Sequence, residues 1–191
     1  MKKKLILIFL AIIILVAALL IGFPYYQNQK EIEKHAFTMD SIDGKVSLSD
    51  FKGKFTIIYF GFMFCPDICP TSLSMTSEAL KRFSKADSDK FQLVFISVDP
   101  DRDKLKDLKE YAGYFYPNAI GLTSTENNLK EVTRKYGTFY ATEYLKDSKI
   151  EYTVAHTSFL YIMDKEGKIK AKLRHPNSPE TIHKALIEVL K

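Results

Sequence analysis

Cysteine is scarce in this sequence: the 191 residues contain two, Cys65 and Cys69, four positions apart. The absence of any cysteine before Cys65 excludes a lipid-modified cysteine as an N-terminal anchor. Clustered positive charge is also lacking. The chain has 28 Lys and Arg against 23 Asp and Glu, and without Lys2–Lys4 the 25 remaining basic residues nearly balance the acids. We therefore expect no nucleic-acid partner. No internal repeat or low-complexity tract is present, which favours one globular domain.

The N-terminus carries a long apolar run. Leu5–Phe23 is uninterrupted after the three lysines, and as a helix it would span about 28 Å, close to the roughly 30 Å hydrocarbon core of a bilayer. The sequence predicts an uncleaved transmembrane anchor over 1–23, because the run is longer than the usual signal-peptide core. The alternative is a cleaved signal with a weak small-residue site at Val16 and Ala18. The positive-inside rule keeps the lysines cytoplasmic, so we expect a single-pass cell (inner) membrane protein whose soluble part is extracytoplasmic, or periplasmic.

The residues after the anchor predict a tether and one domain. The polar segment 24–34 lacks strong periodicity, which suits a tether, and a domain is expected over 35–191. Apolar patterning predicts a hairpin around Asp43-Gly44 and strands at 55–60, 91–98, 119–122, 157–163 and 168–173. It predicts helices at 71–83, at 105–115 with Asp103 as cap, up to 136 before Gly137, and from Ser178-Pro179 onward.

Strands that alternate with helices indicate an α/β sheet. One strand delivers the two cysteines to the start of a helix, and a β-hairpin and a helix close the chain. This order is that of a thioredoxin-like fold, here with an N-terminal β-hairpin and a single preceding transmembrane helix.

The spacing of the cysteines favours a shared metal ion over an easy disulfide. Residues i and i+4 of a helix have Cβ atoms about 5–6 Å apart, whereas a disulfide needs about 3.5–4.5 Å. Two thiolates can each reach one ion at about 2.3 Å without touching. Cys65 just before the helix would still allow oxidation. The amides at a helix start lower thiol pKa, which helps both metal binding and redox chemistry.

A third ligand is sought among the four histidines. We expect His183 to be solvated, His175 to lie at a hairpin end, and His35 to lie at the tether junction. His156 directly precedes the predicted strand 157–163. In a thioredoxin-like sheet the loop entering this strand faces the cysteine helix, so His156 is the candidate. Two thiolates and an imidazole suit Cu(I), Cu(II) or Zn(II), and a three-ligand set suits copper best because structural zinc usually has four protein ligands.

The sequence resembles the Sco/SenC family. The run from Phe64 to Pro70 (FCPDICP) looks like its C-P-D-x-C-P motif, 96–103 (ISVDPDRD) is similar to its S-V-D-P-x-R-D segment, and 154–157 (VAHT) matches its histidine loop. One departure is Ala155, where many relatives have an aspartate. The loss of that acid puts fine tuning of the imidazole in doubt, and leaves the ligand set intact.

This resemblance implies a membrane-anchored, copper-binding, thioredoxin-like metallochaperone or thiol reductase. Cys65, Cys69 and His156 would bind Cu(I) or Cu(II), and the two cysteines would be the redox-active residues of a reductase. The implied partner is the copper-binding subunit of cytochrome c oxidase, whose binuclear copper centre the protein would help to assemble. Another copper chaperone or a thiol reductant is a further expected partner.

Three other functions are weighed against this one. An extracytoplasmic thiol-disulfide oxidoreductase without copper transfer is the main alternative; the three-residue spacer and the absence of proline between Pro117 and Pro176 count against it. A peroxidase would have threonine three residues before the reactive cysteine, where this chain has Pro66. A structural zinc module lacks an evident fourth ligand.

Overall fold

The computed structural model describes residues 2–146, 150–174 and 178–191, and its contacts divide into two units after Lys34. The first unit is helix α1 (Lys2–Lys34). It continues through Pro24, so the segment assigned to a tether is helical. Within it, Ile12–Lys34 is long and apolar enough to cross a membrane by length and composition. The N-terminal helix is therefore a candidate membrane anchor.

The second unit is built on a five-stranded sheet of order β5-β4-β3-β8-β9. Its strands are β3 (Phe55–Gly61), β4 (Phe91–Ser97), β5 (Ile120–Leu122), β8 (Phe159–Met163) and β9 (Ile169–Arg174). The first three are parallel, and β8 and β9 are antiparallel. Every residue of β3 and β4 is buried. This is why both segments are apolar without alternation, as strands covered on both faces are.

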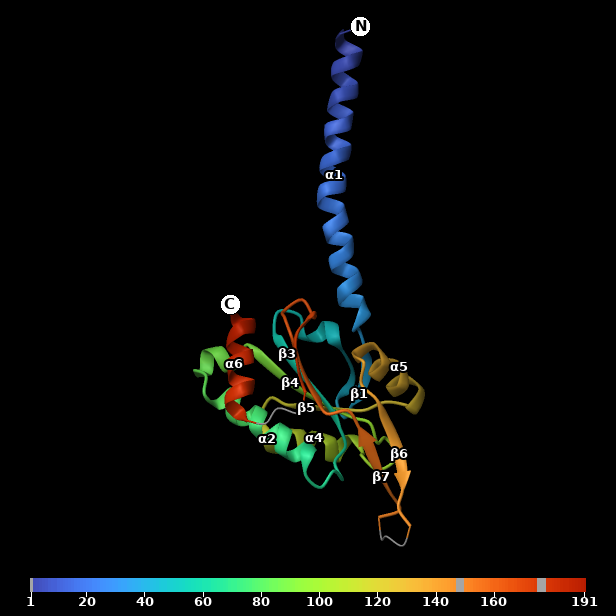
Figure 1. Ribbon diagram of the computed structural model, residues 1–191, viewed down its shortest axis with the longest axis vertical. Coiled ribbons are helices and arrows are strands. Elements are labelled where there is room, and N and C mark those ends of the chain that lie inside the picture. The colour runs from blue at the N-terminus through green and yellow to red at the C-terminus, as the bar shows by residue number, and fades with distance from the viewer. Residues whose placement is uncertain (1, 147–149, 175–177) are drawn as a thin grey trace. The chain divides into compact units, whose positions relative to one another are not determined.

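Helices cover both faces of this sheet. Helix α2 (Ile68–Lys81) joins β3 to β4, and α4 (Leu105–Phe115) joins β4 to β5. Both crossovers step in the same direction, and right-handed crossovers then place both helices on one face. There α2 contacts α4 and the final helix, α6 (Pro179–Leu190). Helix α5 (Glu126–Tyr136) follows β5 and lies away from this group (Figure 1).

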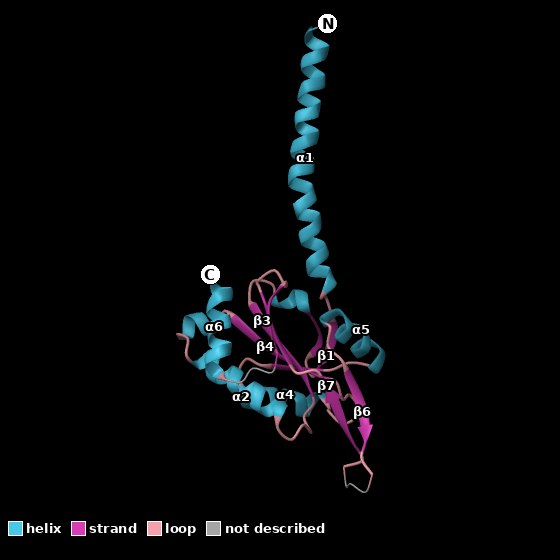
Figure 2. Cartoon of the chain, in the orientation of Figure 1, coloured by secondary structure: helices cyan, strands magenta, loops and turns pink. Residues whose placement is uncertain are grey.

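Two hairpins stand outside the central sheet. Strands β1 (Thr38–Ser41) and β2 (Gly44–Ser47) form the predicted N-terminal hairpin around Asp43-Gly44. A second hairpin, of β6 (Tyr140–Tyr144) and β7 (Tyr152–His156), was not predicted from the sequence. Its strands pair with each other and form a sheet of their own. Figure 2 shows this hairpin extending beyond the central sheet. Two short turns, η1 (Leu48–Phe51) and α3 (Lys85–Ser88), complete the described elements.

Some predicted boundaries are wrong by a few residues. Helix α2 begins at Ile68, three residues before the predicted start, so its first turn includes Cys69. The cap position of α4 is Lys104 and not Asp103. His156 ends β7, and two residues separate it from the start of the next strand, β8. Two predicted helix boundaries are confirmed: α5 ends at its cap residue Gly137, which has a left-handed φ of 59°, and α6 starts at Ser178-Pro179. The architecture is the expected thioredoxin-like α/β fold.

Candidate metal centre

One edge of the central sheet collects the residues of the site. Strands β3 and β4 are parallel, with Gly61 opposite Ser97, so the segments that follow them leave the sheet at the same edge. Strand β8 is antiparallel to β3, with Leu160 opposite Tyr59, so its start lies at that edge too. The cysteines come shortly after the end of β3, and His156 comes shortly before the start of β8, so the chain order brings all three residues to this edge.

The two cysteines lie on either side of the start of α2. Cys65 belongs to the loop before the helix, and its amide donates to the carbonyl of Phe62 at 3.3 Å. Cys69 is in the first helical turn, and its amide donates to the sulfur of Cys65 at 3.4 Å. Both thiols are free, and both residues are buried. The helix start therefore supplies an amide donor that stabilises negative charge on Cys65.

Gly61 makes room for Cys69. A Cβ atom at position 61 would lie 2.9 Å from the sulfur of Cys69, 3.0 Å from the ring of Phe95 and 3.1 Å from that of Tyr59. Real Cβ atoms essentially never approach another atom as closely as 2.9 Å, so a side chain here would displace the Cys69 sulfur, and the two rings would have to give way slightly. The sequence shows that this glycine lies where the strand gives way to the cysteine loop. It does not show that the Cys69 sulfur occupies the space next to it.

His156 reaches the cysteines from the other side. Its Nε2 atom lies 3.3 Å from the sulfur of Cys69. The ring is half-buried and makes T-shaped contacts with the rings of Tyr59 and Phe62, at centroid distances of 6.3 and 5.8 Å. Its Nδ1 atom is buried and has no hydrogen-bond partner among the described residues. The donor atoms of Cys65, Cys69 and His156 all lie within 4.8 Å of one another.

The other histidines are placed elsewhere. The sequence suggested that His183 is solvated, and this is wrong, because the residue is half-buried. It lies between α6 and α2, with Nδ1 3.0 Å from the carbonyl of Ala79 and its ring 4.4 Å from that of Phe83. His35 is buried against Tyr136 at the start of the second unit. His175 lies outside the described residues. The structure thus brings the predicted histidine, and neither His35 nor His183, to the cysteine pair.

The two thiols differ in protonation. The hydrogen bond from Cys69 lowers the pKa of Cys65 to about 4, against the opposing effect of burial, and His156 contributes in the same direction. The pKa of Cys69 is raised well above its usual range, because its proton is shared with Cys65 and because the residue is buried. Burial also raises the pKa of Tyr59, next to Cys69, so its hydroxyl stays protonated. At neutral pH the metal-free site therefore holds one thiolate, on Cys65.

This donor set fits a single soft metal ion. Bonds of about 2.3 Å to sulfur and about 2.0 Å to imidazole nitrogen place three donors around an ion roughly 4 Å from each other. The observed separations are 3.3 Å between the Cys69 sulfur and His156 Nε2 and at most 4.8 Å for the other two pairs, so small shifts suffice to reach this geometry. Two thiolates and one imidazole are ligands that suit copper. Among the described residues, the cluster has three members and no fourth protein donor of the kind that structural zinc uses.

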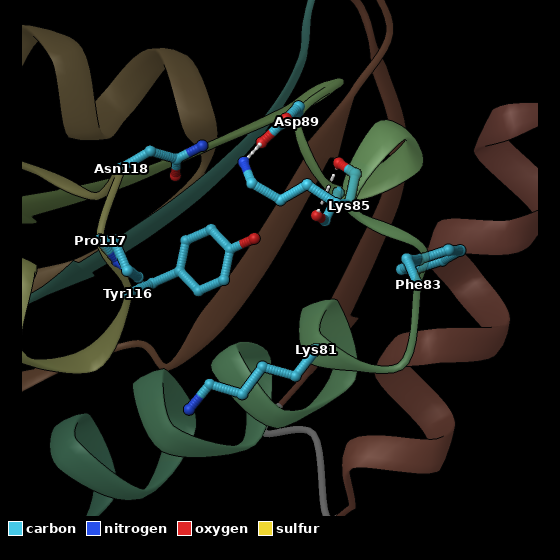
Figure 3. Close-up of a pocket in the computed structure, with 8 residues that line it drawn as sticks. Lys81, Phe83, Lys85, Asp89, Tyr116, Pro117 and Asn118 are labelled. Carbon is cyan, nitrogen blue, oxygen red and sulfur yellow. Dashed lines mark hydrogen bonds and ion pairs between the residues drawn. The ribbon is translucent and has the colours of Figure 1, made fainter.

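A hollow elsewhere on the domain has a different character. It measures about 410 Å³ and lies where β4 begins, at the opposite edge of the sheet from the cysteines. Figure 3 shows Lys85 paired with Asp89 in it, beside the ring of Tyr116. Its lining contains neither cysteine nor histidine. Among the described residues, the group of side chains that could hold a metal ion is the one at the cysteine edge.

Sequence reasoning missed several residues that support the site. Asp103 was taken as a helix cap, but its carboxylate accepts hydrogen bonds from the amide of Met63 and the hydroxyl of Ser97. Arg102 and Tyr152 were not singled out for any role. The segment 96–103 carries part of the family resemblance and contains both Arg102 and Asp103, so it could have drawn attention to these two residues.

Comparison with known proteins places these features in a family. The sequence model of the SCO1/SenC family matches residues 26–191. A SCO2-like protein of Rickettsia conorii is 41% identical over 145 residues, which are 75% of this chain and 70% of the relative. The span of the family model contains Cys65, Cys69 and His156. The relative is named for the same family, which is the family that the sequence resembles.

Solved structures agree. The crystal structure of Arabidopsis thaliana ScoI with copper bound is 32% identical and has a TM-score of 0.75, with 81% of this chain and 96% of that chain covered. A structure of BsSco, described as a member of the Sco family of cytochrome c oxidase assembly proteins with a disulfide switch, is 28% identical with a TM-score of 0.59, and covers 81% of this chain and 91% of that one. These similarities confirm the predicted thioredoxin-like α/β fold.

Proposed function

Because this chain belongs to the SCO1/SenC family, we propose that it is a copper-carrying assembly factor for cytochrome c oxidase. One observation carries the proposal: Cys65, Cys69 and His156, remote in sequence, bring their donor atoms within 4.8 Å of one another. Copper is the cargo of this site. Relatives support the cargo and the client, since ScoI of Arabidopsis thaliana has copper bound and BsSco is described as belonging to a family of cytochrome c oxidase assembly proteins.

The two oxidation states of copper would use the three donors differently. Thiolates are soft ligands that hold Cu(I) well, and the imidazole adds a donor that Cu(II) favours. Cys69 must release its proton when a metal ion binds, because only Cys65 is a thiolate in the metal-free site. Uptake of copper at neutral pH is therefore expected to release one proton from the thiols.

The division of the chain follows from the same proposal. Residues 1–23 would be the transmembrane anchor, 24–34 the tether, here helical, and 35–191 the copper-carrying domain. Lys2–Lys4 would keep the N-terminus in the cytoplasm and place the domain on the extracytoplasmic side of the cell membrane. The apolar segment within α1 supports the anchor. The domain would there meet the copper-binding subunit of an oxidase, and a copper chaperone or thiol reductant that renews it.

A second function, thiol-disulfide exchange without copper transfer, is favoured by one observation: Cys65 has a pKa of about 4 and lies beside a second free thiol. In that reaction the Cys65 thiolate attacks a disulfide of the partner and forms a mixed disulfide. Cys69 then loses its proton and displaces the second partner sulfur. The partner gains two electrons and becomes a dithiol, and this chain keeps the Cys65–Cys69 disulfide.

A copper titration separates these functions. The full chain, reduced and held in detergent micelles, would be titrated with Cu(II) and followed by absorption and electron spin resonance. We expect one equivalent to bind, with thiolate-to-Cu(II) charge-transfer bands and nitrogen coupling from His156. The matched control replaces both cysteines by serine and should lose the bands. A wild-type chain without these bands, whose Cys65 nonetheless exchanges with small disulfides, would replace the copper function by the redox one.

A further inference from the structure

The turn Asp99–Asp103 contacts the loop that joins β3 to α2 and contains Cys65. It follows β4 and so leaves the sheet at the edge where the cysteines lie. The Asp103 side chain is almost fully buried, and its Oδ2 atom accepts from the Met63 amide at 2.9 Å and from the Ser97 hydroxyl at 2.6 Å. The backbone two residues before Cys65 is therefore tied to this turn.

Arg102, in the same turn, contacts the second half of the site. Its Nε donates to Oδ2 of buried Asp99 at 2.6 Å, and its Nη1 donates to the carbonyl of Tyr152 at 2.8 Å. The Tyr152 hydroxyl in turn donates to Oδ1 of Asp99 at 2.8 Å. Three residues thus close a ring of hydrogen bonds that joins the turn to the first residue of β7.

The guanidinium also contacts two aromatic rings. Its central carbon is 3.7 Å from the centroid of the Tyr152 ring and 5.0 Å from that of Phe64. Phe64 directly precedes Cys65, and Tyr152 begins the strand that ends at His156. A single side chain therefore contacts the neighbour of one sulfur donor and the strand of the nitrogen donor.

This contact matters because the histidine is carried by a weak element. Strands β6 and β7 pair with each other and not with the central sheet. A two-stranded hairpin is marginally stable by itself, so its position depends on what it packs against. The arginine supplies a planar group that stacks on the Tyr152 ring and donates to its carbonyl at the same time, which the point charge of a lysine does not.

We propose that Arg102, held by Asp99, is a positioning residue of the metal centre: it fixes the hairpin that carries His156 against the loop that carries Cys65 before copper arrives. The inference rests on the proposed copper function, and it adds a residue outside the donor set. Arg102 would lower the entropic cost of copper binding, because a donor atom that is already in place does not have to be ordered when the ion binds.

The test compares Arg102→Met and Arg102→Lys with Arg82→Met in the full chain. Arg82 is the matched control because it also bridges two elements by ion pairs, Glu78 of α2 and Glu180 of α6, away from the site. In the metal-free chain, amide hydrogen exchange in β7 should accelerate at least tenfold in both Arg102 variants. With copper, Cu(II) affinity should fall by about 10- to 100-fold, the range typical of residues that orient a metal ligand.

Spin resonance gives a readout that a general loss of stability would not change. Cu(II) bound to the Arg102 variants should show weaker nitrogen coupling, because His156 no longer reaches every ion, whereas Arg82→Met should match wild type. Unchanged exchange in β7 together with full nitrogen coupling would overturn the inference. If Arg102→Met does not fold, Arg102→Lys, which keeps the charge beside Asp99, decides it alone. A wild-type chain that binds no Cu(II) refutes the proposed function, and the exchange measurement still judges the positioning role.

Discussion

Replacing His156 by alanine is expected to weaken Cu(II) binding by about 100-fold or more. Residues that merely orient a metal ligand contribute about 10- to 100-fold in affinity, so removal of the ligand itself should reach at least the top of that range. A factor of 100 corresponds to about 2.8 kcal/mol. Cu(I) should lose less than about tenfold, because both thiolates remain and suit the softer ion. The difference between the two losses is the signature of an imidazole donor.

The loss of stability must be separated from the loss of affinity. The His156 ring makes T-shaped contacts with the rings of Tyr59 and Phe62, and aromatic contacts of this kind contribute about 0.5–1.5 kcal/mol each. His183→Ala is the matched control. It removes a ring packed on Phe83 and a contact to the carbonyl of Ala79, and so destabilises the domain by a similar amount.

The assay is a competition titration of the reduced full chain in detergent, against one chelator for Cu(II) and another for Cu(I). Denaturant unfolding of the metal-free variants measures their stability in parallel. We expect His183→Ala to bind both ions as wild type does. Equal loss of Cu(II) affinity in the two variants, or unchanged Cu(II) affinity in His156→Ala, would refute the assignment of His156 to the site.

Two further predictions concern the sulfurs. Because the pKa of Cys65 is lowered to about 4 and that of Cys69 is raised, the metal-free chain should be alkylated first at Cys65. The rate should fall only as the pH drops through about 4 and the thiolate gains its proton; a rate that instead climbs through the usual thiol range, near pH 8.5, would contradict this. Gly61→Ala should destabilise the domain by about 1–3 kcal/mol, since the added methyl group overlaps the Cys69 sulfur. It should also weaken Cu(I) binding, with Gly113→Ala, which meets no atom within 4 Å, as control.

The central sheet was predictable because its strands carry a strong signal. Segments 55–60 and 91–98 are apolar at nearly every position, which is the pattern of strands buried on both faces, and both are strands in the structure. The hairpin of β6 and β7 has no such pattern. Most of its residues are exposed or half-buried, so neither strand shows a clear apolar face, and no two-residue turn signature joins them.

The three donor residues could be found from chain order, whereas the residues that hold them could not. One strand leads into the cysteines and a later strand begins shortly after His156. If these two strands are antiparallel neighbours, the cysteines and His156 lie at the same edge of the sheet. The role of Asp103 depends on a different fact. An aspartate near a helix start can cap the helix or bond elsewhere, and only the position of the Met63 amide, 40 residues away, decides between them.

The separation of the β6–β7 hairpin from the central sheet bears on how the bound metal ion is released. Cys69 lies in the first turn of α2 and Cys65 in the loop that joins β3 to it, while His156 ends β7, which pairs with β6 and with no strand of the central sheet among the described residues. A displacement of β7 therefore breaks no strand pairing of the central sheet. The two sulfur donors and the nitrogen donor are thus held by different elements of the fold, so a change in one element alters one kind of donor at a time.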